Sequence, residues 1–250
     1  MDEQGPRNYY VSKKDRLMKD FDKNIEYFRR ALHSELDEGI AEDILKETRL
    51  EYEELIPRIP YIGGDSNRLT KDVTDSTVGL AFSKVLRRRG YSREEIVEHL
   101  IETMRAHFDS YSLAKMFLVR SVARLLFTFP LNRVYRRFIR GMAERSQRGD
   151  YSDNLVLHYV EGDGEEFDFG IDYTACPINK LWREQGMSDV LPYICLWDYY
   201  SSELTGSGLV RTMTLSEGFD RCDFRFKKGR KPENRQMTQL FTKETGDSED

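Results

Sequence analysis

The spacing of apolar residues changes near residue 155 of this 250-residue chain, and that change limits the folds open to it. Before it, apolar side chains recur every three or four residues, as they do on amphipathic helices. After it, runs of residues alternate between apolar and polar, which indicates strands with one buried face. We therefore predict an α+β fold in which a helical part, residues 12–148, packs against a small antiparallel sheet inside residues 154–228.

The helical part contains one run that is more apolar than the rest, from Ser112 to Phe129. We predict that this run forms the most buried helix of the fold. Arg120 and Arg124 lie one helical turn apart inside it, so burial would place both near its edge. Two guanidiniums on one face could hold a carboxylate. The alternative is that both belong to a solvated helix face.

We predict a sheet of about four strands, arranged as two hairpins with helices between them. The first hairpin pairs residues 155–160 with residues 167–173 through the turn E-G-D-G-E. The second pairs residues 208–215 with residues 221–227. A short helix around residues 179–185 and a longer one over residues 188–204 separate the hairpins, because glycines follow the end of each.

Composition limits the classes of function. The formal net charge of −5 gives no indication of a nucleic-acid partner. The N-terminus lacks a signal-peptide pattern, and the most apolar stretch is interrupted by arginines and a proline, so we expect no membrane partner. Three cysteines cannot all pair within one chain, which favours reduced thiols and a cytoplasmic location. We expect one domain over residues 12–228 with disordered ends at 1–11 and 229–250, and the composition is compatible with a homo-oligomer.

The C-terminal third holds the candidate reactive groups, including all three cysteines. Cys176 ends a predicted strand, and Cys195 lies three residues before Asp198, hence on the same face of the predicted helix. Arg211 shares a strand face with apolar residues, so its guanidinium needs a partner, for which Asp198 is a natural candidate. Cys222 alternates in phase with two phenylalanines and is predicted to face the core. Each cysteine could equally pack as a small apolar residue.

The spacings between the cysteines, nineteen and twenty-seven residues, match no zinc finger or zinc ribbon. A composite metal site of the three cysteines with Asp198 or His158 remains an alternative. We expect no bound metal and no cofactor.

Three segments of this region together resemble a known family. They read D-Y-T-A-C-P from Asp172, L-P-Y-I-C-L-W-D from Leu191, and G-L-V-R-T-M-T-L-S-E-G-F-D-R-C-D-F-R-F from Gly208. In this order and at these distances they are similar to the L-2-amino-thiazoline-4-carboxylic acid hydrolase family. The resemblance covers residues 57–226 and leaves out the first fifty residues and the tail.

The resemblance implies hydrolytic opening of a cyclic amidine, in which the ring C–S bond breaks and an N-carbamoyl-cysteine forms. The protonated amidine is a planar cation, which Asp198 or Asp172 could hold through paired hydrogen bonds. The substrate's own carboxylate needs a cation, either Arg211 or the pair of arginines in the apolar run. Cys222 would line the same site.

Two routes of attack stay open. A thiolate could add to the amidine carbon, with Cys176 favoured over Cys195 because it precedes a short helix whose N–H groups would stabilise its anion. Alternatively, a carboxylate or His158 could activate water. The competing classes of function are a module that binds a small acid without turnover, and a metal-dependent hydrolase that uses the Cys, Asp and His side chains.

Overall fold

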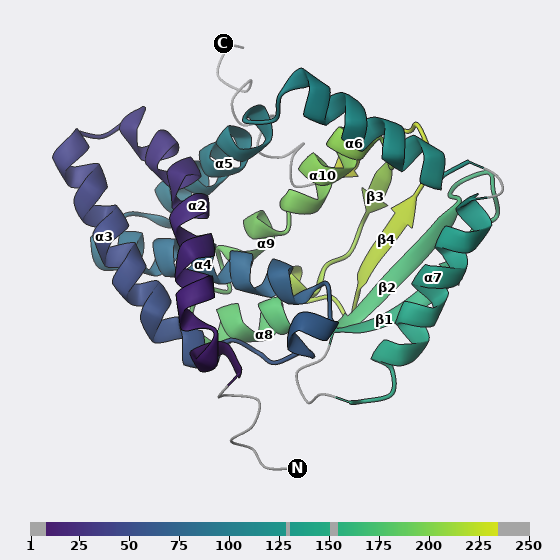
Figure 1. Ribbon diagram of the computed structural model, residues 1–250, viewed down its shortest axis with the longest axis horizontal. Coiled ribbons are helices and arrows are strands. Elements are labelled where there is room, and N and C mark those ends of the chain that lie inside the picture. Colours follow the sequence, from purple (N-terminus) through teal and green to yellow (C-terminus); the bar gives the residue numbers. More distant parts are fainter. Residues whose placement is uncertain (1–8, 129–130, 151–154, 235–250) are drawn as a thin grey trace, which may run out of the picture. The chain divides into compact units, whose positions relative to one another are not determined.

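The computed structural model describes residues 9–128, 131–150 and 155–234, which fall into two compact units (Figure 1). Unit 1 takes the described parts of Met1–Tyr111, Gly149–Leu155 and Cys176–Cys195. Unit 2 takes those of Ser112–Arg148, Val156–Ala175 and Leu196–Asp250. Helices dominate the first half and an antiparallel sheet lies in the second, so the predicted α+β class is confirmed.

The predicted extent of the domain and its ends stays a prediction. Of the two segments expected to be disordered, residues 1–8 and 235–250 lie outside the described residues. In the parts of these segments that the structure describes, residues 9–11 and 229–234, Tyr10 is buried and residues 233–234 form a short strand. Across the described residues, every helix falls short of the length and apolar character that a bilayer crossing requires.

Unit 1 is built from helices around one apolar core. Phe21 and Tyr52 stack between its first two helices with ring centroids 5.1 Å apart, and Trp182, fully buried, donates through its indole N–H to Ser76 at 2.9 Å. The helices are α2 (Lys14–His33), α3 (Glu38–Leu55), α4 (Thr70–Arg88), α5 (Arg93–Asp109), α8 (Pro177–Glu184) and α9 (Leu191–Ile194), with short 3-10 turns η1 (Ile56–Arg58) and η2 (Gly64–Ser66).

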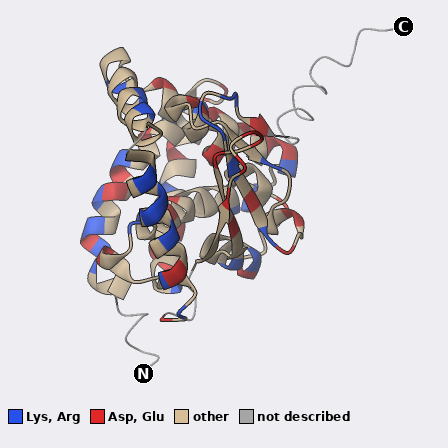
Figure 2. Ribbon diagram, turned by 90° about the vertical axis from the view of Figure 1, so that its right-hand side faces the viewer, with Lys and Arg blue, Asp and Glu red and all other residues tan. Residues whose placement is uncertain are grey.

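A buried carboxylate ties α3 to α4. One oxygen of Glu51 lies 2.6 Å from the ammonium of Lys84, and the other accepts a hydrogen bond from Arg88. Burial would raise the pKa of Glu51, but the two cations outweigh burial and the pKa is lowered from its ordinary value. Exposed pairs such as Arg87–Asp189 add to this pattern, and Figure 2 shows the two charge signs close together along the helical ribbons.

The turn between η1 and α4 depends on glycine. Gly63 and Gly64 have φ angles of 112° and 56°, in the left-handed region that residues with a side chain disfavour. A Cβ on Gly64 would stand 2.5 Å from the ring of Tyr9. The next residue, Tyr10, donates its hydroxyl to the carbonyl of Pro60 at 3.0 Å. The turn therefore holds the first described residues against unit 1.

Unit 2 combines three helices with the sheet. The strand order is β1-β2-β4-β3-β5, in which β1, β2, β4 and β3 pair antiparallel and β5 adds two residues parallel to β3 at the edge. Both predicted hairpins are therefore confirmed. The elements are α6 (Leu113–Leu126), α7 (Leu131–Ser146), β1 (Val156–Glu161), β2 (Phe169–Ala175), α10 (Trp197–Thr205), β3 (Leu209–Arg211), the 3-10 turn η3 (Leu215–Glu217), β4 (Cys222–Phe226) and β5 (Glu233–Asn234).

One face of this sheet is aromatic and apolar. Phe169 pairs with Phe226, and Ile171 pairs with Phe224, across β2 and β4. The rings of Phe169 and Phe226 stack with centroids 5.0 Å apart. Tyr135 on α7 places its ring 5.9 Å from that of Phe169, so α7 covers this face (Figure 1).

The opposite face of the sheet is polar. Asp172 on β2 pairs with His158 on β1 and with Asp223 on β4. Because successive side chains of a strand point to opposite faces, these three residues project away from the aromatic face. The sheet therefore separates two sets of side chains that are close along the sequence.

The prediction that Ser112–Phe129 forms the most buried helix is wrong over its described residues. The helix α6 forms, but none of its fourteen residues is buried. It contacts α7 and α10, and most of its large apolar side chains remain exposed. Apolar composition indicates that a surface tends to be covered, but it does not say that the same chain covers it.

The helix predicted over residues 188–204 is two helices. The short helix α9 ends at Ile194 with Cys195 as its C-cap, and α10 begins at Trp197. Cys195 and Asp198 therefore do not share a helix face, because the spacing argument applies only inside one continuous helix.

Candidate functional site

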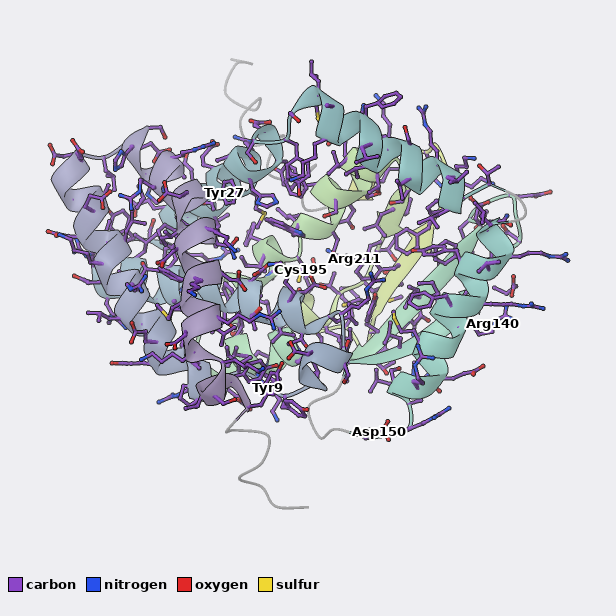
Figure 3. The ribbon with its side chains drawn as sticks, viewed as in Figure 1. Tyr9, Tyr27, Arg140, Asp150, Cys195 and Arg211 are labelled. Atoms are coloured by element: carbon purple, nitrogen blue, oxygen red, sulfur yellow. The ribbon has the colours of Figure 1, made fainter. Side chains whose placement is uncertain are left out.

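A buried arginine organises the aromatic face of unit 2. The guanidinium of Arg211, labelled in Figure 3, lies between the rings of Tyr199 and Phe224, 5.0 and 4.9 Å from their centroids. Its Nη1 donates to Oδ2 of Asp198 at 2.8 Å. The pair Val210–Arg225 of β3 and β4 sets the register, so the next residues, Arg211 and Phe224, lie close together. The helix α10 supplies Asp198 and Tyr199 from consecutive positions. A cation is thus held by two ring faces and one carboxylate.

Tyr199 locks α10 onto β3. Its hydroxyl donates to the backbone carbonyl of Arg211 at 3.2 Å. Burial raises the pKa of Tyr199 to about 12, against the lowering effect of Arg211, so the phenol keeps its proton at neutral pH. Two neighbouring residues of α10 therefore hold Arg211: Asp198 binds its guanidinium and Tyr199 binds its backbone carbonyl.

The two partners of the ion pair differ in accessibility. The side chain of Arg211 is 2% exposed, whereas that of Asp198 is 41% exposed. Desolvation raises the pKa of Asp198 above its ordinary value, and Arg211 offsets only part of this rise. Because the group is partly open to water and lies 2.8 Å from a guanidinium, we treat it as a carboxylate at neutral pH. The site therefore combines a carboxylate that solvent can reach, Asp198, with a buried cation, Arg211.

Two sequence-predicted residues lie on the other face of the sheet. Asp172 accepts a hydrogen bond from Arg225 at 2.7 Å, and its second oxygen lies 3.6 Å from Nε of Arg221. His158 is exposed, with Nε2 3.1 Å from the hydroxyl of Thr174. The structure thus separates Asp172 and His158 from Arg211 and Asp198 by the thickness of the sheet.

Cys222 occupies the aromatic face, as predicted. It is buried, and its Sγ accepts a hydrogen bond from the backbone N–H of Leu215 at 3.2 Å. The adjacent Asp223 accepts from the backbone N–H groups of Thr212 and Met213 at 2.8 and 2.6 Å. These contacts fix the segment that follows β3 and so hold Arg211 at the end of its strand.

The other two cysteines belong to unit 1. Cys176 is half-buried at the N-cap position of α8, whose first residue is Pro177. Cys195 is half-buried at the C-cap of α9 and packs against the core of unit 1. Cys176 is the first residue and Cys195 the last residue of the final chain segment that belongs to unit 1.

The arginines of the apolar run lie on the surface of unit 2. Arg120 and Arg124 are both exposed on α6, and Nε of Arg120 donates to the carbonyl of Leu204 at 3.2 Å. That carbonyl belongs to the last turn of α10, where a cation is favoured by the helix dipole. Arg120 therefore has a structural partner within unit 2.

Sequence reasoning missed the two rings beside Arg211 and the role of Asp223, whose carboxylate binds the backbone that follows β3. Tyr199 directly follows Asp198 on α10, so a ring close to the predicted Asp198–Arg211 pair could have been expected from the sequence. Phe224 stands against Arg211 only because β3 and β4 pair in one particular register. Asp223 serves the backbone of the turn after β3, for which the sequence carries no distinctive motif.

Among the described residues, a metal centre and a pocket are two further kinds of candidate site. Within residues 9–128, 131–150 and 155–234, no three His, Cys, Asp or Glu side chains lie close enough together to hold a metal ion. A pocket of about 180 Å³ in unit 2 contains none of the predicted site residues. It is lined by Leu126, Phe127, Asn132, Tyr135, Arg136, Asp168, Phe169, Lys227 and Lys228.

Comparison with known proteins gives one family. The family model described as L-2-amino-thiazoline-4-carboxylic acid hydrolase matches residues 78–226, a segment that contains both hairpins, α10 and all three cysteines. No curated protein and no solved structure matches the chain. Since the matched segment covers more than half of the sequence, the chain belongs to the L-2-amino-thiazoline-4-carboxylic acid hydrolase family.

Proposed function

We propose that the protein hydrolyses a five-membered cyclic amidine of the 2-amino-thiazoline-4-carboxylate type. One water is consumed: its oxygen ends on the former amidine carbon, the ring C–S bond breaks, and the ring sulfur leaves as a thiol. The product is an N-carbamoyl amino acid with a free thiol. Family membership supports this reaction class, and the Arg211–Asp198 pair supports a place for the substrate.

Asp198 is the proposed substrate-binding carboxylate. A protonated amidine carries its charge over two nitrogens in one plane, which a carboxylate can meet with two short hydrogen bonds. Asp198 is accessible for such a contact, while Arg211 is sealed between two rings. We therefore give Arg211 the role of a positioning residue, which holds Asp198 ionised and oriented, in place of direct contact with the substrate's carboxylate.

For the attack we propose the thiolate route, as a hypothesis separate from the role of Asp198, because Cys176 belongs to unit 1 and Asp198 to unit 2. The thiolate of Cys176 adds to the amidine carbon, the ring C–S bond breaks, and the ring sulfur takes a proton. Water then attacks the enzyme-bound thiouronium carbon and releases the thiol of Cys176 together with the N-carbamoyl product. The position of Cys176 at the start of α8 supports the choice, because helix N–H groups favour an anionic sulfur.

Turnover of L-2-amino-thiazoline-4-carboxylate by the purified protein is the direct test, followed through release of the free thiol and of the carbamoyl product. We expect Asp198→Asn to lower kcat/KM by about a hundredfold or more. Asp220→Asn, which changes an exposed aspartate of unit 2, should leave it unchanged and serves as the control. Arg211→Lys should shift the acidic limb of the pH profile, because it changes the group that holds Asp198.

The three cysteine variants divide the routes. Cys176→Ser should abolish turnover, while Cys222→Ser should retain most of it. Full activity in Cys176→Ser and Cys195→Ser would reject the thiolate route and favour water activated by a carboxylate or His158. Tight binding of the substrate without any turnover in the wild-type protein would reject the hydrolase and leave a binding module.

A further inference from the structure

The helix α6 exposes a broad apolar face. Leu113, Phe117 and Leu118 are 81%, 74% and 62% exposed, and Val122 and Leu125 are also exposed. At 3.6 residues per turn these five positions fall on one side of the helix. Large apolar side chains scattered singly over a surface need no explanation, but a continuous row marks a surface that another body covers.

The neighbouring helix α7 extends this surface. It contacts α6 and exposes Leu131, Val134 and Phe138, which recur at helical spacing on a face other than the one that packs on the sheet. Its buried residues, Ile139, Ala143 and Ser146, lie on its inner side. We call the eight exposed apolar residues named here, five on α6 and three on α7, the α6–α7 apolar surface.

The two helices that carry this surface are rich in cations, although Arg136 and Arg140 of α7 form ion pairs with Glu161 of β1. Residues 112–148 contain nine lysines and arginines and a single acidic residue, Glu144. On α6 itself, Lys115 and Arg124 lie on opposite flanks of the apolar face, about a quarter turn from its centre. The surface therefore combines an apolar centre with cationic borders.

We propose that the α6–α7 apolar surface docks onto a phospholipid bilayer that contains anionic lipids. A helix with one apolar side and cationic flanks lies in the plane of such an interface, with its apolar side chains among the acyl chains and its cations beside the lipid phosphates. Among the described residues no helix could span a bilayer, and peripheral docking needs none. The proposal therefore departs from our expectation of no membrane partner, which rested on the lack of a spanning segment. This inference is independent of the reaction proposed above.

Charge disfavours a second copy of the chain as the occupant. A symmetric dimer brings the same patch of both copies together, so the cations of one α6 would face those of the other. Within residues 112–148, Glu144 alone offers an opposite charge for such a contact. An anionic lipid surface supplies the missing charge at every position along the helix.

Flotation with vesicles tests the proposal on the full chain. The probes are vesicles of phosphatidylcholine alone and of phosphatidylcholine with one-third phosphatidylserine. We expect the protein to float with the second and not with the first, and to be released by high salt. The double variant Phe117→Ser/Leu118→Ser should lose about tenfold or more of the bound fraction, and Lys115→Gln/Arg124→Gln should bind several-fold less.

Matched controls come from α3, whose Leu50 is 63% exposed and whose Lys46 lies in an exposed ion pair. Leu50→Ser and Lys46→Gln should bind the anionic vesicles as the wild type does. Failure of the wild-type protein to bind either vesicle would overturn the proposal. It would also be overturned by an oligomer in sedimentation equilibrium that dissociates in Phe117→Ser/Leu118→Ser, because the occupant would then be a second copy.

Discussion

Removing the carboxylate of Asp198 should destabilise the protein more than removing the arginine that binds it. The reason is the difference in their exposure. Asp198→Ala leaves a guanidinium that is 2% exposed without its carboxylate, whereas Arg211→Met leaves a carboxylate that water already reaches. A buried charge that loses its partner cannot regain solvation without local unfolding.

The magnitudes follow from this asymmetry. Loss of one partner of a buried pair costs about 3–5 kcal/mol, and the rings that remain on both sides of Arg211 place Asp198→Ala at about 3 kcal/mol. Arg211→Met should cost about 1–2 kcal/mol, because a methionine fills the slot between two rings and makes favourable sulfur–aromatic contacts. Asp198→Asn keeps an oxygen that accepts from Nη1 and should cost about 1–2 kcal/mol.

Urea unfolding followed by circular dichroism measures these free energies, provided that the slope m stays constant across the set. The double variant Asp198→Ala/Arg211→Met should be no less stable than Arg211→Met alone, within about 0.5 kcal/mol, because the uncompensated charge is gone. The reasoning is refuted if Asp198→Ala costs less than Arg211→Met, or if the two losses simply add in the double variant.

Three further results are expected. Glu51→Gln should make the free energy of unfolding less sensitive to acid. The lowered pKa of Glu51 contributes stability that is present above about pH 4.3 and is lost as the pH falls through the folded-state pKa. Urea titrations of both proteins at several pH values would measure the difference. Gly64→Ala should lower the free energy of unfolding by about 2 kcal/mol or more. Gly90→Ala, at a φ of 90° but with no atom within 4 Å of the new Cβ, should cost only about 1 kcal/mol, and equal losses would show that the ring contact is unimportant. Cys176 should be alkylated by iodoacetamide faster than Cys222 at neutral pH and be protected by the substrate, and peptide mapping that finds uniform slow labelling would contradict its role as a nucleophile.

Much of the fold was open to prediction because its signals are local. The period of two over residues 155–160 and 167–173 reports strands whether or not the partner strand is known, and turn residues mark the hairpins. The fate of α6 was not open to prediction in the same way. Its apolar composition is a property of the helix, but burial is a property of what surrounds it, and the contacts of α6 with α7 and α10 leave none of its residues buried.

The candidate site was predicted in part for the same reason. Arg211, with its place on an apolar strand face, indicated a buried cation, and Asp198 was named as its partner. The grouping of Asp172 and His158 with them rested on closeness along the sequence. The register of β1 with β2 sends both to the polar face, since neighbouring strand residues point in opposite directions.

The sequence by itself determined the class of fold, the two hairpins and the family, because each depends on residue types at short or fixed spacings. Only the tertiary structure decided that Arg211 lies between Tyr199 and Phe224, that Asp198 stays accessible while its partner does not, and that α6 exposes its apolar side. Those outcomes depend on the register between strands and on which surfaces meet. Both are set by contacts between residues far apart in the chain, which local spacing does not encode.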